Sequence, residues 1–175
     1  MSVRPTLQLG DPALRAPSGP VADPASPEIA ALTADLADTL ADWRARTTYG
    51  RGIAAPQIGA PLRLVYLDLG EPWVLVNPRI TARSAETWRP WDTCLSFSVA
   101  FFGAAERARR IDVAWTTPDG AHRELRADGD LAELLQHEID HLDGVLAVDR
   151  MAEPGALCMR AEFERRHRAT SPYRA

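Results

Sequence analysis

The chain lacks the features that would assign it to an oxidising compartment or a membrane. It has only two cysteines among 175 residues, too few for the disulfide framework of a small secreted domain. No apolar run approaches the roughly 20 residues that cross a bilayer, and segment 1–5 has no apolar signal-peptide core. We therefore expect a cytoplasmic protein that makes no contact with membranes.

Lysine is absent altogether, so all 20 basic residues are arginine; a coding preference explains this, and no function follows from it. The formal net charge of −4 gives no sign of a nucleic-acid footprint, so DNA is not an expected partner. A composition of 46% hydrophobic and 25% charged residues is typical of a globular protein. At this length we expect one domain over residues 1–175.

Three segments have the apolar spacing of helices. They are expected at 26–46, 128–144 and 157–168. In the first, Ser26 is a suitable N-cap and Pro27 fits the first helical position; this helix should run to about Arg46, with Gly50 as the stop signal after it. Gly144 is the expected end of the second. After the third helix, residues 168–175 form a polar tail that is expected to fray.

The middle of the chain contains the runs that predict strands. These are Leu62–Leu69, Trp73–Asn77, Ile80–Ala82 and Ile111–Thr116, with Ala121–Arg126 returning as a hairpin partner after the turn at Thr117–Gly120. Strands clustered between helical ends favour an α+β fold over alternating strands and helices. We therefore expect mixed or antiparallel β-sheets packed around the central helix, with an N-terminal and a C-terminal helix on either side.

The central helix carries the pattern H-E-x-x-H. His137 and His141 are four residues apart, so on a helix both side chains lie on one face and can bind one metal ion. Glu138 then lies beside that ion, where a carboxylate can take a proton from an attacking water. The pattern indicates metal-assisted hydrolysis, but it leaves open both the third ligand and the substrate.

A hydrolytic metal site needs three protein ligands and one open position. Glu162 or Glu164 would complete a site like that of the thermolysin-type proteases, whereas Cys94 would give one thiolate and two imidazoles. The two glutamates lie in a short arginine-rich segment where helical ion pairs explain them. The surroundings therefore favour Cys94, which lies among apolar residues in the middle of the chain.

Three motifs in this order resemble the peptide deformylases. They are G-x-G-I-A-A-P-Q at 50–57, C-L-S at 94–96 and Q-H-E-x-D-H-L-D-G at 136–144, and the resemblance extends to about Arg150. That family removes the formyl group from the N-terminus of new proteins. It implies one divalent metal ion per chain, natively Fe(II), with zinc, nickel or cobalt as substitutes. The implied partner is a formylated peptide N-terminus, with transient contact to the ribosome.

The resemblance also implies a role for each matching position. The metal ligands would be Cys94, His137 and His141, and Glu138 would be the general acid and base. Gln57 would donate its side-chain amide, and Leu95 its backbone N–H, to the oxygen that becomes negative. Gly52 and Ile53 would offer backbone groups to the peptide. The full set of implied substrate-binding residues is Gly50, Arg51, Gly52, Ile53, Thr93 and Glu133.

The chain departs from the family beside this site. Thr93 stands where the family has glycine, and Asp92 replaces a glutamate that an arginine, here Arg107, would pair with. Arg51, Asp130 and Glu133 occupy positions that in the family line an apolar pocket for methionine, and buried unpaired charge is costly. Two alternatives stay open. Either these charges pair or face solvent and formyl-methionine is the substrate, or the enzyme acts on a different N-formyl compound; a thermolysin-like protease is less favoured.

Overall fold

The computed structural model describes residues 2–151 and 153–173. Its helices are α1 (Pro27–Thr47), α2 (Gly129–Leu142) and α3 (Arg160–Arg166). Its strands are β1 (Gly52–Ala54), β2 (Leu64–Asp68), β3 (Pro72–Arg83), β4 (Thr87–Trp88), β5 (Trp91–Asp92), β6 (Phe101–Ala104), β7 (Arg107–Ala108), β8 (Arg110–Thr116), β9 (His122–Asp128) and β10 (Leu157–Met159). Short 3-10 helices connect them. The expected α+β class with antiparallel sheets and three helices is confirmed.

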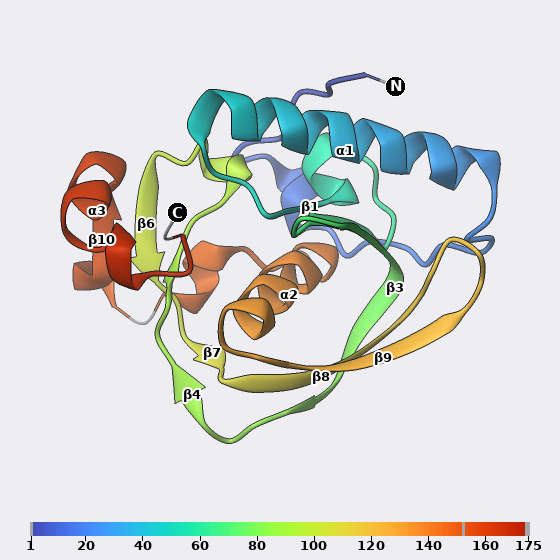
Figure 1. Ribbon diagram of the computed structural model, residues 1–175. Coiled ribbons are helices and arrows are strands. Elements are labelled where there is room, and N and C mark those ends of the chain that lie inside the picture. The colour runs from blue at the N-terminus through green and yellow to red at the C-terminus, as the bar shows by residue number, and fades with distance from the viewer. Residues whose placement is uncertain (1, 152, 174–175) are drawn as a thin grey trace.

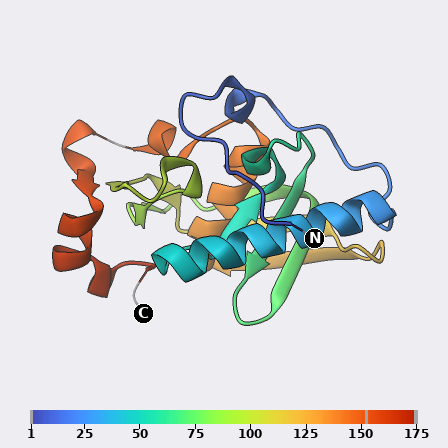
Figure 2. The ribbon, with the colours of Figure 1, turned by 90° about the horizontal axis from the view of Figure 1, so that it is seen from above.

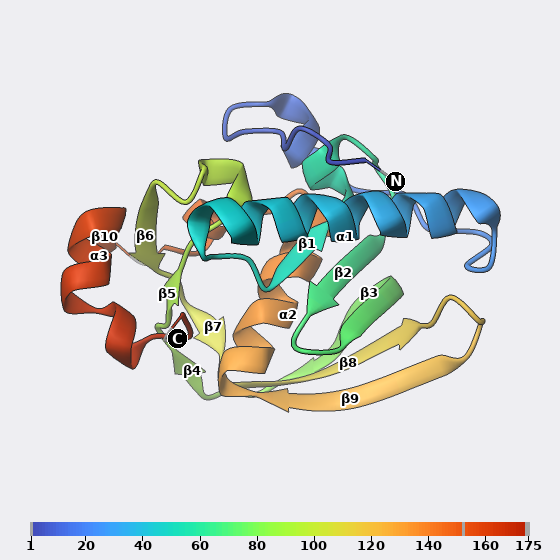
Figure 3. The ribbon, with the colours of Figure 1, turned by 45° about the horizontal axis from the view of Figure 1, so that its top comes forward.

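The largest sheet has five antiparallel strands in the order β1-β2-β3-β8-β9. It curves around α2, while α1 crosses on the other side (Figure 1, Figure 3). Alternate residues of a strand point to opposite faces, and β2 shows the result. Leu64 and Tyr66 pack with the core under α1, whereas Val65 and Leu67 pack with the core under α2. The sheet thus holds α2 in a fixed position between its concave face and the smaller sheets.

The residues that cap helix α1 set both of its ends. The Ser26 hydroxyl accepts the Ile29 N–H at 3.3 Å, which satisfies a backbone donor that the helix leaves free. The helix ends at Thr47, one residue after the expected Arg46, because Thr48 adopts a left-handed conformation with φ 65°. The chain then turns directly into β1.

Two smaller sheets lie at the other side of α2. One has the order β10-β6-β5 and the other pairs β4 with β7. β5 ends at Asp92, and a 3-10 helix begins at Leu95 after Cys94. This arrangement brings the segment 92–95 opposite β1, across α2. Short strands of two to four residues carry too little periodicity to be found in the sequence.

The predicted third helix is wrong in its first turn. Residues Leu157–Met159 form β10, which pairs with β6, and the helix starts only at Arg160. The predicted pair of strands at 73–77 and 80–82 is one strand with two register irregularities. Long-range pairing overrides local preference in both places.

The C-terminal tail differs from the expectation of fraying. A 3-10 helix covers Arg168–Thr170, and Tyr173 packs against rings of Tyr49 and Phe102. Residues 174–175 lie outside the described part of the chain. The reason for the difference is that α3 directs the chain back toward the end of α1 (Figure 1), where aromatic side chains receive it.

The N-terminal segment crosses the outside of the molecule before α1 (Figure 2). Its backbone bonds to three separate elements: Leu7 N–H to Gln57, Leu9 N–H to Ser96 and Ser18 N–H to Leu142, each at 2.8 Å. It therefore fastens together the segments that carry the three sequence motifs. None of the helices in the described ranges is long and apolar enough to cross a membrane.

Candidate active site

Three buried donor atoms meet where α2 faces the segment after β5. The Nε2 atoms of His137 and His141 are 3.2 Å apart, and the Cys94 Sγ lies 3.2 Å from His141 Nε2. The two histidines share a face of α2 because they are four residues apart. Cys94 is held by the turn into the 3-10 helix, where the Ser96 N–H donates to its sulfur at 3.3 Å. All three ligand atoms lie within 4.8 Å of one another.

A buried chain of charges orients His137. Its Nδ1 lies 2.9 Å from the Asp92 carboxylate, which accepts from Arg107 at 2.9 Å on its other oxygen. Arg107 also pairs with Asp140, and Arg150 pairs with Asp140 at 2.8 Å. Burial would raise the pKa of Asp92, but His137 and Arg107 hold it below its usual range. The Asp92–Arg107 pair expected from the sequence is present.

Loss of Arg107 should destabilise the fold strongly. Its guanidinium stands between two buried carboxylates, and removing one partner of a buried pair typically costs about 3–5 kcal/mol. We expect Arg107→Met to lower the free energy of unfolding by about that amount in urea titrations of the metal-free protein. Arg126→Met is a matched control, because Arg126 pairs with Asp112 at the exposed surface of the sheet and should change stability far less. Equal effects of the two variants would contradict this account.

Glu138 lies against a glycine that leaves room for it. A Cβ at Gly52 would come within 2.7 Å of Glu138 Oε1 and 2.6 Å of the Leu67 side chain, so any larger residue there would displace the Glu138 carboxylate. Glu138 is buried, and its Oε2 has no hydrogen-bond partner among the described residues. Burial, opposed by His137, raises the pKa of Glu138 to about 7. A carboxyl in this state can both accept and release a proton near neutrality.

Gln57 presents a fixed amide donor to the same cavity. It lies in the 3-10 helix Ala55–Ile58, where its Oε1 accepts the Ala54 N–H at 2.8 Å. Its Nε2 therefore points the other way, 3.3 Å from both the Cys94 sulfur and the Ser96 hydroxyl. Leu95 also lines the cavity. Gln57 and Leu95, the two residues predicted to stabilise negative charge, thus line the part of the cavity next to Cys94.

The free edge of β1 forms a second wall. β1 is at the end of the sheet order, and the Asp68 N–H donates to the Arg51 carbonyl at 2.9 Å. Residues alternate in an antiparallel ladder, so the backbone of Gly52 faces the free edge and that of Ile53 faces β2. The Ile53 side chain is fully buried in the core. Gly52 and Ile53 were both predicted to offer backbone groups to a peptide. Of the two, only Gly52 has its backbone N–H and carbonyl at the free edge of β1.

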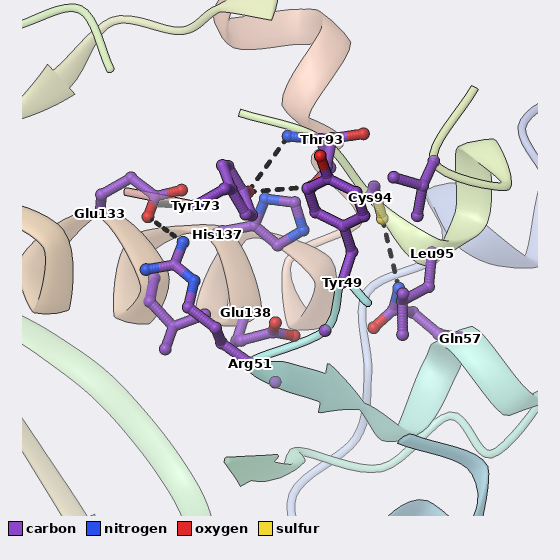
Figure 4. A pocket seen from close by; sticks show the side chains of 14 residues that line it. Tyr49, Arg51, Gln57, Thr93, Cys94, Leu95, Glu133, His137, Glu138 and Tyr173 are labelled. Atoms are coloured by element: carbon purple, nitrogen blue, oxygen red, sulfur yellow. Dashed lines mark hydrogen bonds and ion pairs between the residues drawn. The ribbon is translucent and has the colours of Figure 1, made fainter. Parts of the chain in front are cut away.

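The charged residues expected beside the site are largely paired. Arg51 and Glu133 form an ion pair in the cavity wall (Figure 4), and Arg51 also donates to the Asp130 carbonyl at 3.4 Å. Glu133 is fully buried, which raises the pKa of its carboxyl despite Arg51. Gly50 and Thr93 line the same cavity. Arg51 and Glu133 therefore pair with each other, as the formyl-methionine alternative requires.

Two tyrosines in the cavity wall were not found by sequence reasoning. Tyr49 follows α1, and Tyr173 comes from the C-terminal segment; both line the cavity with the predicted residues. The Tyr173 hydroxyl accepts the Thr93 N–H at 3.3 Å. A tyrosine in a polar terminal segment has no pattern that marks it, because its position depends on how α3 packs.

The donor set fits a single metal ion. Because the Nδ1 of His137 bonds to Asp92, its Nε2 lone pair faces Cys94 and His141, as ligating histidines require. One thiolate and two imidazoles suit iron, zinc, nickel and cobalt. Asp92, Glu133 and His137 form a second group of possible ligands, but an arginine already pairs with each acid. The first group is therefore the better metal site.

The two downstream glutamates are held elsewhere. Glu162 pairs with Arg165 and Arg166 on α3. Glu164 pairs with Arg160 and accepts from the Tyr49 hydroxyl at 3.1 Å. Neither belongs to the groups of potential ligands found among the described residues. The arrangement therefore does not support a thermolysin-like third ligand.

Three buried side chains that could hold a metal ion, together with a buried carboxylate and an amide donor in the adjoining cavity, are the arrangement expected of a metal-dependent hydrolase. Comparison with known proteins narrows this class. The polypeptide deformylase family matches residues 3–156. Peptide deformylase 2 of Clostridium perfringens is 39% identical over 156 residues, which cover 87% of this chain and 96% of that protein.

Solved structures agree with the sequence comparison. The crystal structure of peptide deformylase from Thermotoga maritima has a TM-score of 0.80 at 32% identity and covers 87% of this chain and 100% of that one. Peptide deformylase from Synechococcus elongatus in complex with actinonin has a TM-score of 0.79 at 31% identity, over 91% and 84%. The chain belongs to the peptide deformylase family, whose members are metal-dependent hydrolases that remove N-formyl groups from nascent peptides.

Proposed function

We propose that this enzyme removes the formyl group from N-formylmethionyl peptides with a single Fe(II) ion held by Cys94, His137 and His141. The observation that carries this proposal is the convergence of these three donor atoms within 4.8 Å, beside Glu138 and Gln57 in one cavity. When bound, the metal would lower the pKa of a water from about 15.7 to about 7. Zinc, nickel or cobalt would substitute, because the same donor set suits them.

In this proposal Glu138 moves the proton. Its carboxylate takes a proton from the attacking water and gives it to the amine that leaves with the peptide, so one group acts first as base and then as acid. Burial favours both steps by raising the pKa of Glu138 to about 7. Asp92, fixed by Arg107, keeps His137 in the tautomer that a ligand needs.

Gln57 and Leu95 would stabilise the oxygen of the formyl group as it becomes negative. The Gln57 Nε2 is already aimed into the cavity because Oε1 is fixed by the Ala54 N–H. A donor fixed in advance costs no reorganisation during the reaction. The free edge of β1 at Gly52 would bind the peptide backbone as an added strand.

Replacement of Gln57 tests this assignment. Loss of one such donor typically lowers kcat about 100- to 1000-fold, and we expect that loss in Gln57→Ala and Gln57→Glu. The glutamate keeps the acceptor for the Ala54 N–H but, when ionised, removes the donor and buries a charge beside Cys94, so its melting temperature should fall below that of Gln57→Ala. Steady-state formate release and thermal melting measure the two effects. An active Gln57→Ala variant would exclude the amide as a necessary donor.

The substrate itself is tested with a panel of formylated amines. The enzyme purified without oxygen and loaded with Fe(II) should release formate from formyl-Met-Ala-Ser faster than from formylated small molecules. A second candidate is a different N-formyl compound: Arg51 and Glu133 pair with each other, but they leave the cavity wall charged at positions where the family has an apolar pocket. That candidate replaces the first if a formyl compound with a polar side chain is clearly the better substrate.

The proposal extends to the setting of the reaction. Residues 1–175 would act as one catalytic domain in the cytoplasm, on nascent chains during translation and with transient contact to the ribosome. The family's activity on nascent peptides supports this setting. Cosedimentation of the enzyme with translating ribosomes, against ribosomes without nascent chains, would test it.

A further inference from the structure

The C-terminal segment places an aromatic side chain inside the active-site cavity. Tyr173 lines the same space as Cys94, His137 and Glu138. Its ring lies 4.8 Å from the Arg51 guanidinium, and its hydroxyl lies within 3.5 Å of the N–H and carbonyl of Thr93. Figure 4 shows the side chain beside Glu133 and His137, with dashed lines to Thr93.

This position lies between the two segments that face a bound substrate. Arg51 directly precedes β1, and Thr93 directly precedes Cys94. With Tyr173 in place, the cavity has a volume of about 30 Å³. That is room for roughly two waters and too little for the side chain of a peptide. The Arg51–Glu133 pair therefore cannot act as a pocket floor until the ring moves.

The segment that carries Tyr173 can leave without unravelling a sheet. The N–H groups of Thr170 and Ser171 donate to His167 and Arg168 inside the segment, and the Tyr173 N–H donates to the Ser171 hydroxyl at 3.1 Å. The Tyr173 hydroxyl holds Thr93 by contacts of 3.3 and 3.5 Å, which are long for an O–H donor or acceptor. Displacement thus costs the ring contacts with Tyr49, Phe102 and Phe163, the contact with the Arg51 guanidinium and the long hydroxyl contacts with Thr93 and Asp92, but no strand pairing.

We propose that Tyr173 is an autoinhibitory plug, which occupies the place of the substrate's first side chain and must be displaced before a formylated peptide binds. The proposal rests on the deformylase function and adds a control of access to it. A protein whose open state is populated at about 10% or less binds substrate at least about tenfold more weakly than the open form does.

Two variants and one exchange measurement test the plug. Tyr173→Ala should lower KM for formyl-Met-Ala-Ser about tenfold with little change in kcat. Tyr173→Phe keeps the ring and loses the hydroxyl contacts with Thr93 and Asp92, so its KM should fall less. In the wild-type enzyme, hydrogen exchange of segment 167–173 should become faster when actinonin binds, while segment 49–54 should exchange more slowly. Because the exchange readout uses wild type, it decides the matter even if Tyr173→Ala does not fold.

The opposite results overturn the proposal. If Tyr173 were instead a fixed part of the pocket wall, the bound ligand would cover it and hydrogen exchange at 167–173 would slow. Tyr173→Ala would then raise KM or leave it unchanged. The deformylase function fails separately. If actinonin speeds exchange of the tail but the wild type releases no formate from any formyl peptide, the plug stands and the proposed reaction does not.

Discussion

Glu138→Gln should lower the rate of formate release by about 100- to 10,000-fold, the usual contribution of a general acid or base. The glutamine has the same shape as the glutamate, so it fits the tight space against Gly52. A Cβ on that glycine would lie only 2.7 Å from Oε1 of Glu138. It cannot take a proton from water. Metal content, measured by mass spectrometry of the purified protein, should stay at the wild-type level because Cys94 and the histidines are untouched.

A control separates this effect from a change of net charge. Glu124 lies exposed on β9, at the surface of the sheet, and Glu124→Gln removes the same charge without touching the cavity. Its kcat should match that of the wild type. If Glu138→Gln retained more than about a tenth of wild-type activity, proton transfer by this carboxylate would be excluded as a main source of catalysis.

Cys94→Ser should cause the second large effect, the loss of the metal. Replacing even an outer partner of a ligand weakens metal binding by about 10- to 100-fold, and in the proposed site Cys94 supplies one of the three ligand atoms. We expect purified Cys94→Ser to retain little metal and to lose formate release with it. A chelator competition gives the change in affinity directly, with the wild type measured under the same oxygen-free conditions.

The second cysteine supplies the matched control. Cys158 is half-buried on β10, and Cys158→Ser should leave both metal content and activity unchanged. Full metal content in Cys94→Ser would mean that another side chain completes the site, and would return Glu162 or Glu164 to consideration. Both acids are at present paired on α3.

The predictable part of the site lies on a single helix and in short motifs. His137 and His141 are four residues apart, so helix geometry alone brings them together. Cys94 follows from its apolar surroundings and from the family motif, and the structure places its sulfur 3.2 Å from His141. The long elements α1 and α2 were predictable for the same reason: caps and apolar spacing act within a few residues.

Features that depend on distant partners could not be predicted. Leu157–Met159 has the composition of a helix, but pairing with β6 makes it a strand. Tyr173 enters the cavity because α3 turns the chain back, and no local pattern encodes that turn. Arg51 and Glu133 were identified as misfits to an apolar pocket. That they pair with each other depends on how β1 packs against α2.

The free edge of β1 has a consequence for when the enzyme can act. An edge strand binds a partner through backbone groups, and the partner must itself be extended over several residues. A polypeptide whose first residues already belong to a helix or a sheet cannot offer that conformation. Deformylation and folding of the new chain are therefore in competition for its N-terminus, and formyl groups should persist on proteins whose N-termini fold first.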